Sequence, residues 1–279
     1  MTFRRLLIIL MAAALAVMTA CSEIAGEPSS SSDPESRPFL SSGGSGRHFR
    51  DRKSHQPYSI SPEESSEIED FAGQLENVPD AGQEVADYSE LTRGYTYSQS
   101  EKTYFYSPFA GILIDITGWT QMDLYELAES FDLEPGALSE WSGEDFMNNF
   151  ITPDLYAYKF DLKSMQNVMI MTFFENISID DIAGKNRKEY LLFQLGQLAD
   201  VEDGSVFSDP MTVTLSGKEF IGVRCSYSGS SIGFTQYTLV RQYGDYMYNI
   251  SIMGTNLDDI QDVCDLFLEV PDGPSGELN

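Results

Sequence analysis

Histidine is almost absent from this chain, and the two that occur, His48 and His55, lie close to the N-terminus. The rest of the sequence therefore has no imidazole for general base catalysis, for a Ser-His-Asp triad or for a transition-metal site. Basic residues are also few: 17 Lys and Arg stand against 44 Asp and Glu in 279 residues, a formal net charge of −27. So acidic a chain repels nucleic acid phosphates, and a DNA- or RNA-binding role is not expected. These shortages predict a protein that is not an enzyme and needs no cofactor.

Long apolar runs are also missing, except for residues 6–17 near the N-terminus. That run is shorter than the roughly 20 residues that a membrane-spanning helix needs. It follows Arg4 and Arg5 and precedes Met18-Thr19-Ala20-Cys21, which gives it the architecture of an export signal. The last four residues resemble the lipobox of bacterial lipoproteins, in which the cysteine takes a diacylglyceryl group and cleavage occurs just before it.

The resemblance implies a signal peptide over residues 1–20, lipidation of Cys21 with fatty acids such as palmitate, and an extracytoplasmic protein held at the cell membrane. Met18 stands where the lipobox usually has Leu. An ordinary secretory signal followed by a cysteine is the alternative, since the same architecture fits both.

Residues 21–94 are rich in serine and acidic residues and poor in apolar ones. Such a composition buries too little surface to offset the entropy of ordering, so we expect a disordered tether. Its basic cluster, residues 47–53, is interpreted as solvated linker charge. A short helix that starts near Ser61-Pro62 and runs through Leu75 fits the helix-start signal. Residues 272–279 are expected to form a disordered tail.

Residues 95–271 are long enough for one domain with its own core. From Tyr95 to the end, 29 Asp and Glu against 9 Lys and Arg leave a net charge of −20. Alternation and helical periodicity predict α+β structure, an antiparallel sheet with helices packed on one face. Strands are expected over residues 104–116, 155–161, 168–175, 211–215, 219–227, 234–242 and 246–253, and helices over residues 121–131, 137–150, 180–199 and 257–268.

Several turns in this domain resemble those of the PsbP/Mog1/DcrB-like superfamily, especially its Gram-positive lipoprotein members. They are Gly118-Trp119 after an early strand, residues 216–220 (SGKEF) and residues 243–248 (YGDYMY). The resemblance implies a non-enzymatic binding or assembly module for another envelope protein. The alternative is a lipoprotein that binds a small ligand or glycan in a pocket between sheet and helices.

Gly229, Ser231 and Gly233 match the nucleophile-elbow pattern G-x-S-x-G. That pattern needs a strand-to-helix turn and a later histidine; neither is expected here, so we interpret it as a hairpin turn. Residues 144–145, 180–181, 202–203 and 258–259 are paired carboxylates. Their places at helix starts or turns favour capping over calcium or acid-base chemistry. Residues 200–204 are the best calcium candidate, but they lack EF-hand spacing, and no metal site is predicted.

Two features leave alternatives open. Cys225 and Cys264 fall on apolar faces of a strand and of the last helix, which are expected to pack together, so a disulfide and two buried free thiols both fit. The domain is also rich in aromatic residues, including Tyr95, Tyr97, Tyr104, Phe105, Tyr106, Tyr237, Tyr243, Tyr246 and Tyr248. These rings form either an exposed platform for a glycan or peptide, or ordinary strand residues with high β-propensity.

Overall fold

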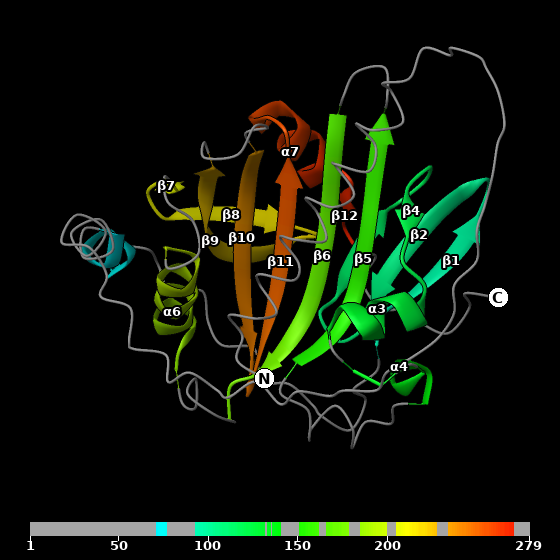
Figure 1. Ribbon diagram of the computed structural model, residues 1–279, viewed down its shortest axis with the longest axis horizontal. Helices are drawn as coiled ribbons and strands as arrows, with labels where there is room; N and C mark the ends of the chain where they lie inside the picture. Colours follow the sequence, from blue (N-terminus) through cyan, green and yellow to red (C-terminus); the bar gives the residue numbers. More distant parts are fainter. Residues whose placement is uncertain are drawn as a thin grey trace, which may run out of the picture.

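The computed structural model describes residues 71–76, 93–131, 133–134, 136–140, 151–161, 166–178, 185–199, 205–227 and 234–270. An eight-stranded antiparallel sheet, the large sheet, runs through these residues in the order β4-β5-β6-β11-β10-β9-β7, with β8 also paired to β9 (Figure 1). Its strands are β4 (Thr120–Gln121), β5 (Ile151–Asp161), β6 (Gln166–Asn176), β7 (Ser205–Phe207), β8 (Met211–Leu215), β9 (Lys218–Tyr227), β10 (Phe234–Tyr243) and β11 (Tyr246–Gly254). The hairpin β5–β6 and the meander from β8 to β11 confirm the strands that the alternating pattern predicted.

A second, four-stranded sheet, the small sheet, has the order β1-β2-β3-β12. Its strands are β1 (Tyr95–Gln99), β2 (Lys102–Ser107), β3 (Ile112–Asp115) and β12 (Phe267–Leu268). The prediction of one strand over residues 104–116 is wrong, because a turn in which the Gly111 N–H donates to the Pro108 carbonyl at 3.3 Å divides it into β2 and β3. Proline has no N–H to donate to a strand ladder, which favours a break at this point.

Two hydrophobic cores lie on opposite faces of the large sheet. The labelled helices are α3 (Leu124–Ser130), α4 (Ala137–Glu140), α6 (Arg187–Ala199) and α7 (Leu257–Cys264). The helix-side core contains Leu127 of α3 and Tyr190 of α6. The sheet-side core contains Phe105 of the small sheet and Ile260 of α7. The predicted α+β class with antiparallel sheets is confirmed, and α7 lies on the face opposite to α3 and α6.

Local signals explain where the helices begin. The Asp123 side chain accepts hydrogen bonds from the N–H groups of Tyr125 and Glu126, both at 2.9 Å, and the Glu126 carboxylate accepts the Asp123 N–H at 3.2 Å. This reciprocal capping box satisfies N–H groups that the first turn leaves unpaired. Asn256 caps α7 by accepting the N–H of Asp259 at 2.9 Å. The helix predicted over 180–199 is described from Arg187 onward.

A helical segment over residues 71–76 belongs to the folded part of the chain. Phe71 and Leu75 are 5% and 1% exposed and join the helix-side core. The carbonyl of Glu76 accepts a hydrogen bond from Lys188 of α6 at 3.3 Å. This corrects the assignment of all of residues 21–94 to a disordered tether, because two apolar residues of that range are buried. It agrees with the predicted short helix through Leu75.

Cys225 and Cys264 are not joined by a disulfide and lie on opposite sides of the large sheet. Cys225 is in the helix-side core, whereas Cys264 packs against the sheet-side core. The expectation that their two elements pack together face to face is wrong, because the large sheet lies between the two side chains. Of the two alternatives left open by the sequence, this arrangement agrees with unbonded thiols.

Candidate functional site

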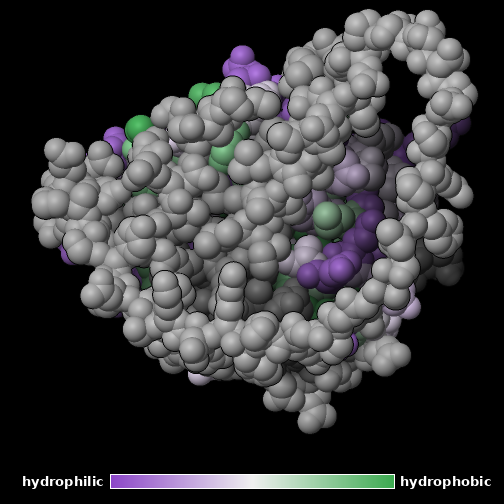
Figure 2. All heavy atoms as spheres, in the orientation of Figure 1, coloured by the Kyte–Doolittle hydropathy of each residue, from purple (hydrophilic) through white to green (hydrophobic). Residues whose placement is uncertain are grey.

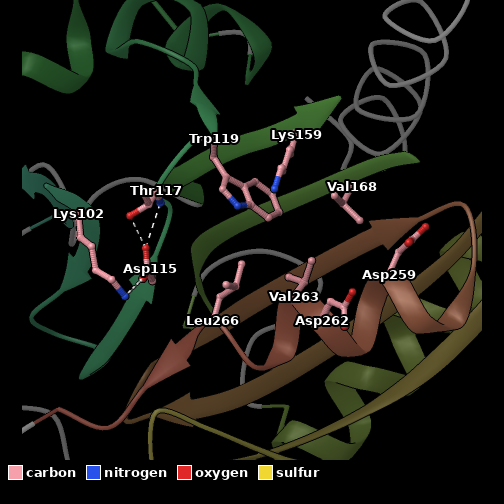
Figure 3. Close-up of a pocket in the computed structure, with 10 residues that line it drawn as sticks. All are labelled: Lys102, Asp115, Thr117, Trp119, Lys159, Val168, Asp259, Asp262, Val263 and Leu266. Carbon is pink, nitrogen blue, oxygen red and sulfur yellow. Dashed lines mark hydrogen bonds and ion pairs between the residues drawn. The ribbon is translucent and has the colours of Figure 1, made fainter. Parts of the chain in front are cut away.

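A pocket opens between the small sheet and α7, which both cover the same face of the large sheet. Its volume is about 440 Å³, within the range of about 300–1,000 Å³ typical of small-molecule sites. We call it the junction pocket. Figure 3 shows that Val168, Val263 and Leu266 supply apolar groups, while Trp119 and Lys159 project beside one another from a second side. Apolar surface, one aromatic ring and several charges therefore converge on one cavity.

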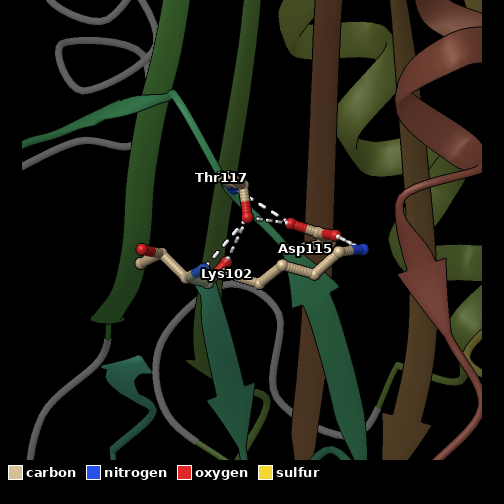
Figure 4. Close-up of polar contacts among 4 residues, drawn as sticks. Lys102, Asp115 and Thr117 are labelled. Carbon is tan, nitrogen blue, oxygen red and sulfur yellow. Dashed lines mark hydrogen bonds and ion pairs between the residues drawn. The ribbon is translucent and has the colours of Figure 1, made fainter. Parts of the chain in front are cut away.

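Three residues in and next to the small sheet line this pocket and are joined by hydrogen bonds: Lys102, Asp115 and Thr117 (Figure 4). Lys102 Nζ lies 2.8 Å from Asp115 Oδ2, and Asp115 Oδ1 accepts hydrogen bonds from the Thr117 N–H at 3.0 Å and its hydroxyl at 2.5 Å. Partial burial raises the pKa of Asp115, but the hydrogen bonds from Lys102 and Thr117 outweigh this and leave the pKa below its usual value. The same hydrogen bond raises the pKa of Lys102. Both groups are therefore charged at neutral pH.

On the opposite side, α7 presents two carboxylates with different surroundings. Asp259 is 4% exposed and accepts hydrogen bonds from Thr255 Oγ1 and Asn256 Nδ2, both at 2.8 Å. Asp262, one turn further along the helix, is exposed. Asp259 is thus committed to the start of α7, as the capping interpretation of residues 258–259 expects. Asp262 lines the pocket without a hydrogen-bond or ion-pair partner among the described residues.

A second feature lies on the outer face of the small sheet. Tyr95 pairs with Tyr106 and Tyr97 with Tyr104 across β1 and β2. The ring centroids of Tyr97 and Tyr104 are 5.5 Å apart and stacked, and those of Tyr95 and Tyr106 are 5.9 Å apart, edge to face. Tyr95 is 46% exposed, whereas Phe105, which points the other way, is fully buried. We call these four residues the tyrosine face.

The structure divides the aromatic residues that the sequence singled out. Tyr95, Tyr97, Tyr104 and Tyr106 form the tyrosine face, while Phe105, Tyr237, Tyr243, Tyr246 and Tyr248 are buried in the sheet-side core. Burial raises the pKa of Tyr97, and the neighbouring tyrosines add to the rise. Burial likewise raises the pKa of Tyr106. The aromatic residues thus divide into a cluster on one face of the small sheet and a buried set in the sheet-side core.

An apolar pocket of about 270 Å³ lies on the other face, between the large sheet and α3. Tyr156, Tyr158, Met169 and Met253 line it, and Lys159 reaches its edge. On this side of the molecule, Figure 2 shows hydrophilic and hydrophobic atoms side by side near α3 and β5. This pocket has the position that the alternative prediction gave, between sheet and helices, but it has few polar groups.

Each face of the large sheet also buries one carboxylate. On the helix side, Glu175 Oε2 accepts hydrogen bonds from the Tyr190 hydroxyl and, at 3.3 Å, from Gln194 Nε2. Its Oε1 is buried with no hydrogen-bond partner among the described residues. Burial raises the pKa of Glu175 to about 8, although the hydrogen bond from Tyr190 opposes the rise.

On the sheet side, Asp154 Oδ1 accepts the Gly94 N–H at 2.5 Å and Oδ2 accepts the Tyr248 hydroxyl at 3.2 Å. Arg93 donates to the carbonyls of Pro153 and Asp154 at 3.0 and 3.3 Å. Gly94 is required here, because a Cβ would lie 2.2 Å from the Phe105 ring. Burial raises the pKa of Asp154, and hydrogen bonds and the charge of Arg93 oppose the rise. Neither Asp154 nor Glu175 lines either of the two pockets described above. We therefore assign both carboxylates a structural role.

Several predicted sites lie outside the described residues: Cys21, the basic cluster over 47–53, the calcium candidate over 200–204 and the G-x-S-x-G segment over 229–233. Among the residues that the structure does describe, no group of three or more His, Cys, Asp or Glu side chains is placed to hold a metal ion. No helix in the described ranges is long and apolar enough to cross a membrane. The pocket residues Trp119, Lys159 and Asp262 were missed as a set, since no spacing joins them.

Comparisons with known proteins give similarity in structure but not in sequence. No protein-family model matches the sequence, and no curated protein matches it. The structure is similar to the solution structure of cyanobacterial PsbP (CyanoP) from Synechocystis sp. PCC 6803, with 10% identity and a TM-score of 0.31, over 69% of this chain and 99% of that one. At a TM-score of 0.31 this likeness carries no argument about this chain.

Proposed function

We propose that this chain is an extracytoplasmic lipoprotein, anchored through Cys21, whose domain binds another envelope protein without catalysing a reaction. The observation that carries the proposal is the tyrosine face. Its rings lie on the side of the small sheet opposite to the buried Phe105; Tyr95 is 46% exposed, and the other three tyrosines are half-buried. Clustered tyrosines supply large, rigid contact area, which is why they are enriched where proteins bind one another.

The partner is a protein segment that carries Lys or Arg. Tyrosine rings attract cations through their negative faces, and a net charge of −20 from Tyr95 onward attracts a basic partner. Lys102 at the border of the tyrosine face is neutralised by Asp115, so it does not oppose such a partner. An acidic partner would meet repulsion from the whole domain.

Site-specific photocrosslinking tests this docking surface. A photoreactive phenylalanine analogue replaces Tyr97 in the full chain in cells, and a matched chain carries it at Tyr125 of α3, which is 60% exposed on the other side of the molecule. We expect a defined crosslinked product from position 97 and none from position 125. Mass spectrometry should place the crosslink in a partner peptide that contains Lys or Arg. Identical products from both positions, a partner peptide without basic residues, or no product would contradict the proposal.

The anchor is tested separately. Cys21→Ala removes the thiol that lipidation needs, and the acyl chains it carries contribute about 0.8 kcal/mol per buried methylene. We expect the variant to leave the membrane fraction while wild-type chain stays in it, as measured by fractionation and immunoblotting. A variant that remains in the membrane fraction would disprove anchoring through Cys21 and leave the crosslinking result unaffected.

A further inference from the structure

We propose that the junction pocket binds a neutral saccharide of one or two rings. This inference goes beyond the proposed function, because Trp119 and Asp262 of the pocket do not belong to the tyrosine face. Lys102 and Asp115 stand at the border of the two surfaces, so the tests below avoid them. Each of the two proposals can therefore fail while the other holds.

The polar groups of the pocket divide into those already satisfied and those still available. Lys102 and Asp115 are paired at 2.8 Å, and Asp259 is bonded to Thr255 and Asn256. Within the described part of the chain, neither Lys159 nor Asp262 has a hydrogen-bond or ion-pair partner, and both line the pocket. They come from different elements, β5 and α7. The pocket thus offers one free donor group and one free acceptor group on different sides of one cavity.

The apolar part of the pocket suits the face of a sugar ring. Trp119 is half-buried, packs against the sheet-side core and turns its indole toward the cavity beside Lys159 (Figure 3). Val168 and Val263 add aliphatic surface. The C–H groups on one side of a pyranose pack on an aromatic ring, while its hydroxyls donate to a carboxylate and accept from an ammonium group. Pockets that combine apolar walls with a few placed polar groups are the usual form of small-ligand sites.

The charges of the pocket disfavour other ligands. Three carboxylates, of Asp115, Asp259 and Asp262, outnumber the two ammonium groups of Lys102 and Lys159, so a phosphate group meets net repulsion. A fatty acyl chain would desolvate those five charged groups without hydrogen-bonding any of them. A zwitterion such as a free amino acid matches Lys159 and Asp262 but leaves the indole face uncovered. A saccharide engages all three residues.

Tryptophan fluorescence reports binding directly, because the chain has two tryptophans and Trp141→Phe leaves Trp119 as the only one. The full chain with this substitution is titrated at millimolar concentrations with N-acetylglucosamine, its β-1,4-linked dimer, maltose and cellobiose, and in parallel with glycine, glutamate and inorganic phosphate. We expect a saturable change in Trp119 emission with at least one saccharide and none with the other probes. No saturable response to any of the four saccharides, or a response to an amino acid or phosphate alone, overturns the proposal.

A matched pair of variants places the ligand. Asp262→Asn is expected to weaken saccharide binding about tenfold or more, because a hydrogen bond to a charged group contributes about 1.5–3 kcal/mol and each 1.4 kcal/mol is tenfold. Asp258→Asn changes another exposed acid of α7 that does not line the pocket, and it should keep the affinity within about twofold. Lys159→Met should weaken binding as well. Equal losses from Asp258→Asn and Asp262→Asn would show that the pocket is not the binding site.

Discussion

Both faces of the large sheet bury a carboxylate, but the two carboxylates are held by different kinds of donor. Asp154, on the sheet side, accepts a backbone N–H and a hydroxyl and lies near the guanidinium of Arg93. Glu175, on the helix side, accepts from the neutral side chains of Tyr190 and Gln194, and one of its oxygens has no partner in the described part of the chain. Burial raises the pKa of both.

This difference indicates which of the two carboxylates the stability of the fold depends on. Asp154 connects Gly94 to the large sheet by accepting its N–H. Removal of the Asp154 side chain would leave the Gly94 N–H and the Tyr248 hydroxyl without this acceptor. The charged form of Glu175 is poorly compensated, so the folded protein holds this carboxyl group protonated at neutral pH. A permanently neutral side chain there removes the free-energy cost of that proton uptake. We therefore expect substitutions at Asp154 and Glu175 to change the free energy of unfolding in opposite directions.

The largest effect is expected for Asp154→Ala. It removes the acceptor of the buried Gly94 N–H and Tyr248 hydroxyl, and breaking a buried charged network in this way costs about 3–5 kcal/mol. Urea denaturation of the full chain at pH 7 measures the loss. Asp209→Ala, at an exposed aspartate, is the control and should change stability by less than about 0.5 kcal/mol. A loss at Asp154 no larger than that of the control would show that Asp154 does not hold the start of the domain.

Glu175→Gln is expected to stabilise the protein by about 3 kcal/mol at pH 7, since each unit of pKa shift corresponds to about 1.4 kcal/mol. The folded pKa of Glu175, about 8, lies above the ordinary glutamate value of 4.5. The unfolded chain therefore loses its proton first as the pH rises, and wild-type stability falls from pH 4.5 to 8. The gain from Glu175→Gln should be near zero at pH 4.5 and grow over that window.

Urea denaturation across this pH series checks the expectation, with Glu134→Gln, at an exposed glutamate, as the control. A gain at Glu175 that does not vary with pH would mean that the carboxyl group does not titrate in the folded state. A loss of stability at pH 7 would mean that its charged form is well compensated, and the contrast with Asp154 would then disappear.

The sequence predicts best where one face of a strand is buried and the other is not. In the second half of β9, Ile221, Val223 and Cys225 are buried and alternate with the half-buried Arg224 and Ser226, so the pattern itself predicts a strand. The hairpin β2–β3 is harder to predict from the sequence, because apolar residues continue through both strands and only a short turn divides them. A local pattern shows that an element is amphipathic, but it does not show which side of a sheet covers it.

This limit explains the errors at the site level. The periodicity of α7 identified Ile260 and Val263 as its buried side but not the face of the large sheet on which it lies. The junction pocket could not be predicted either, because Trp119, Lys159 and Asp262 come from three separate parts of the chain: the segment before β4, β5 and α7. The tyrosine face was partly visible, since strand tyrosines at positions 95, 97, 104 and 106 suggest a platform. Their cross-strand register settled which of the aromatic residues form it.

The smallest effect is expected for the two thiols on opposite faces of the large sheet. Their alkylation tests whether the sheet separates them. In the Cys21→Ala chain, Cys225 and Cys264 are the remaining cysteines. After denaturation and alkylation, the mass should show two adducts with and without prior reduction, because the large sheet keeps the thiols apart.

In the folded protein, burial and the nearby Asp265 raise the pKa of Cys264 to about 11. Alkylation at Cys264 should therefore be slow at pH 8 and faster at higher pH, since the thiolate is the nucleophile. Cys225, which is fully buried, should stay unmodified until the protein unfolds. A mass that gains adducts only after reduction would show a disulfide and disprove the placement of α7 on the face opposite to α6.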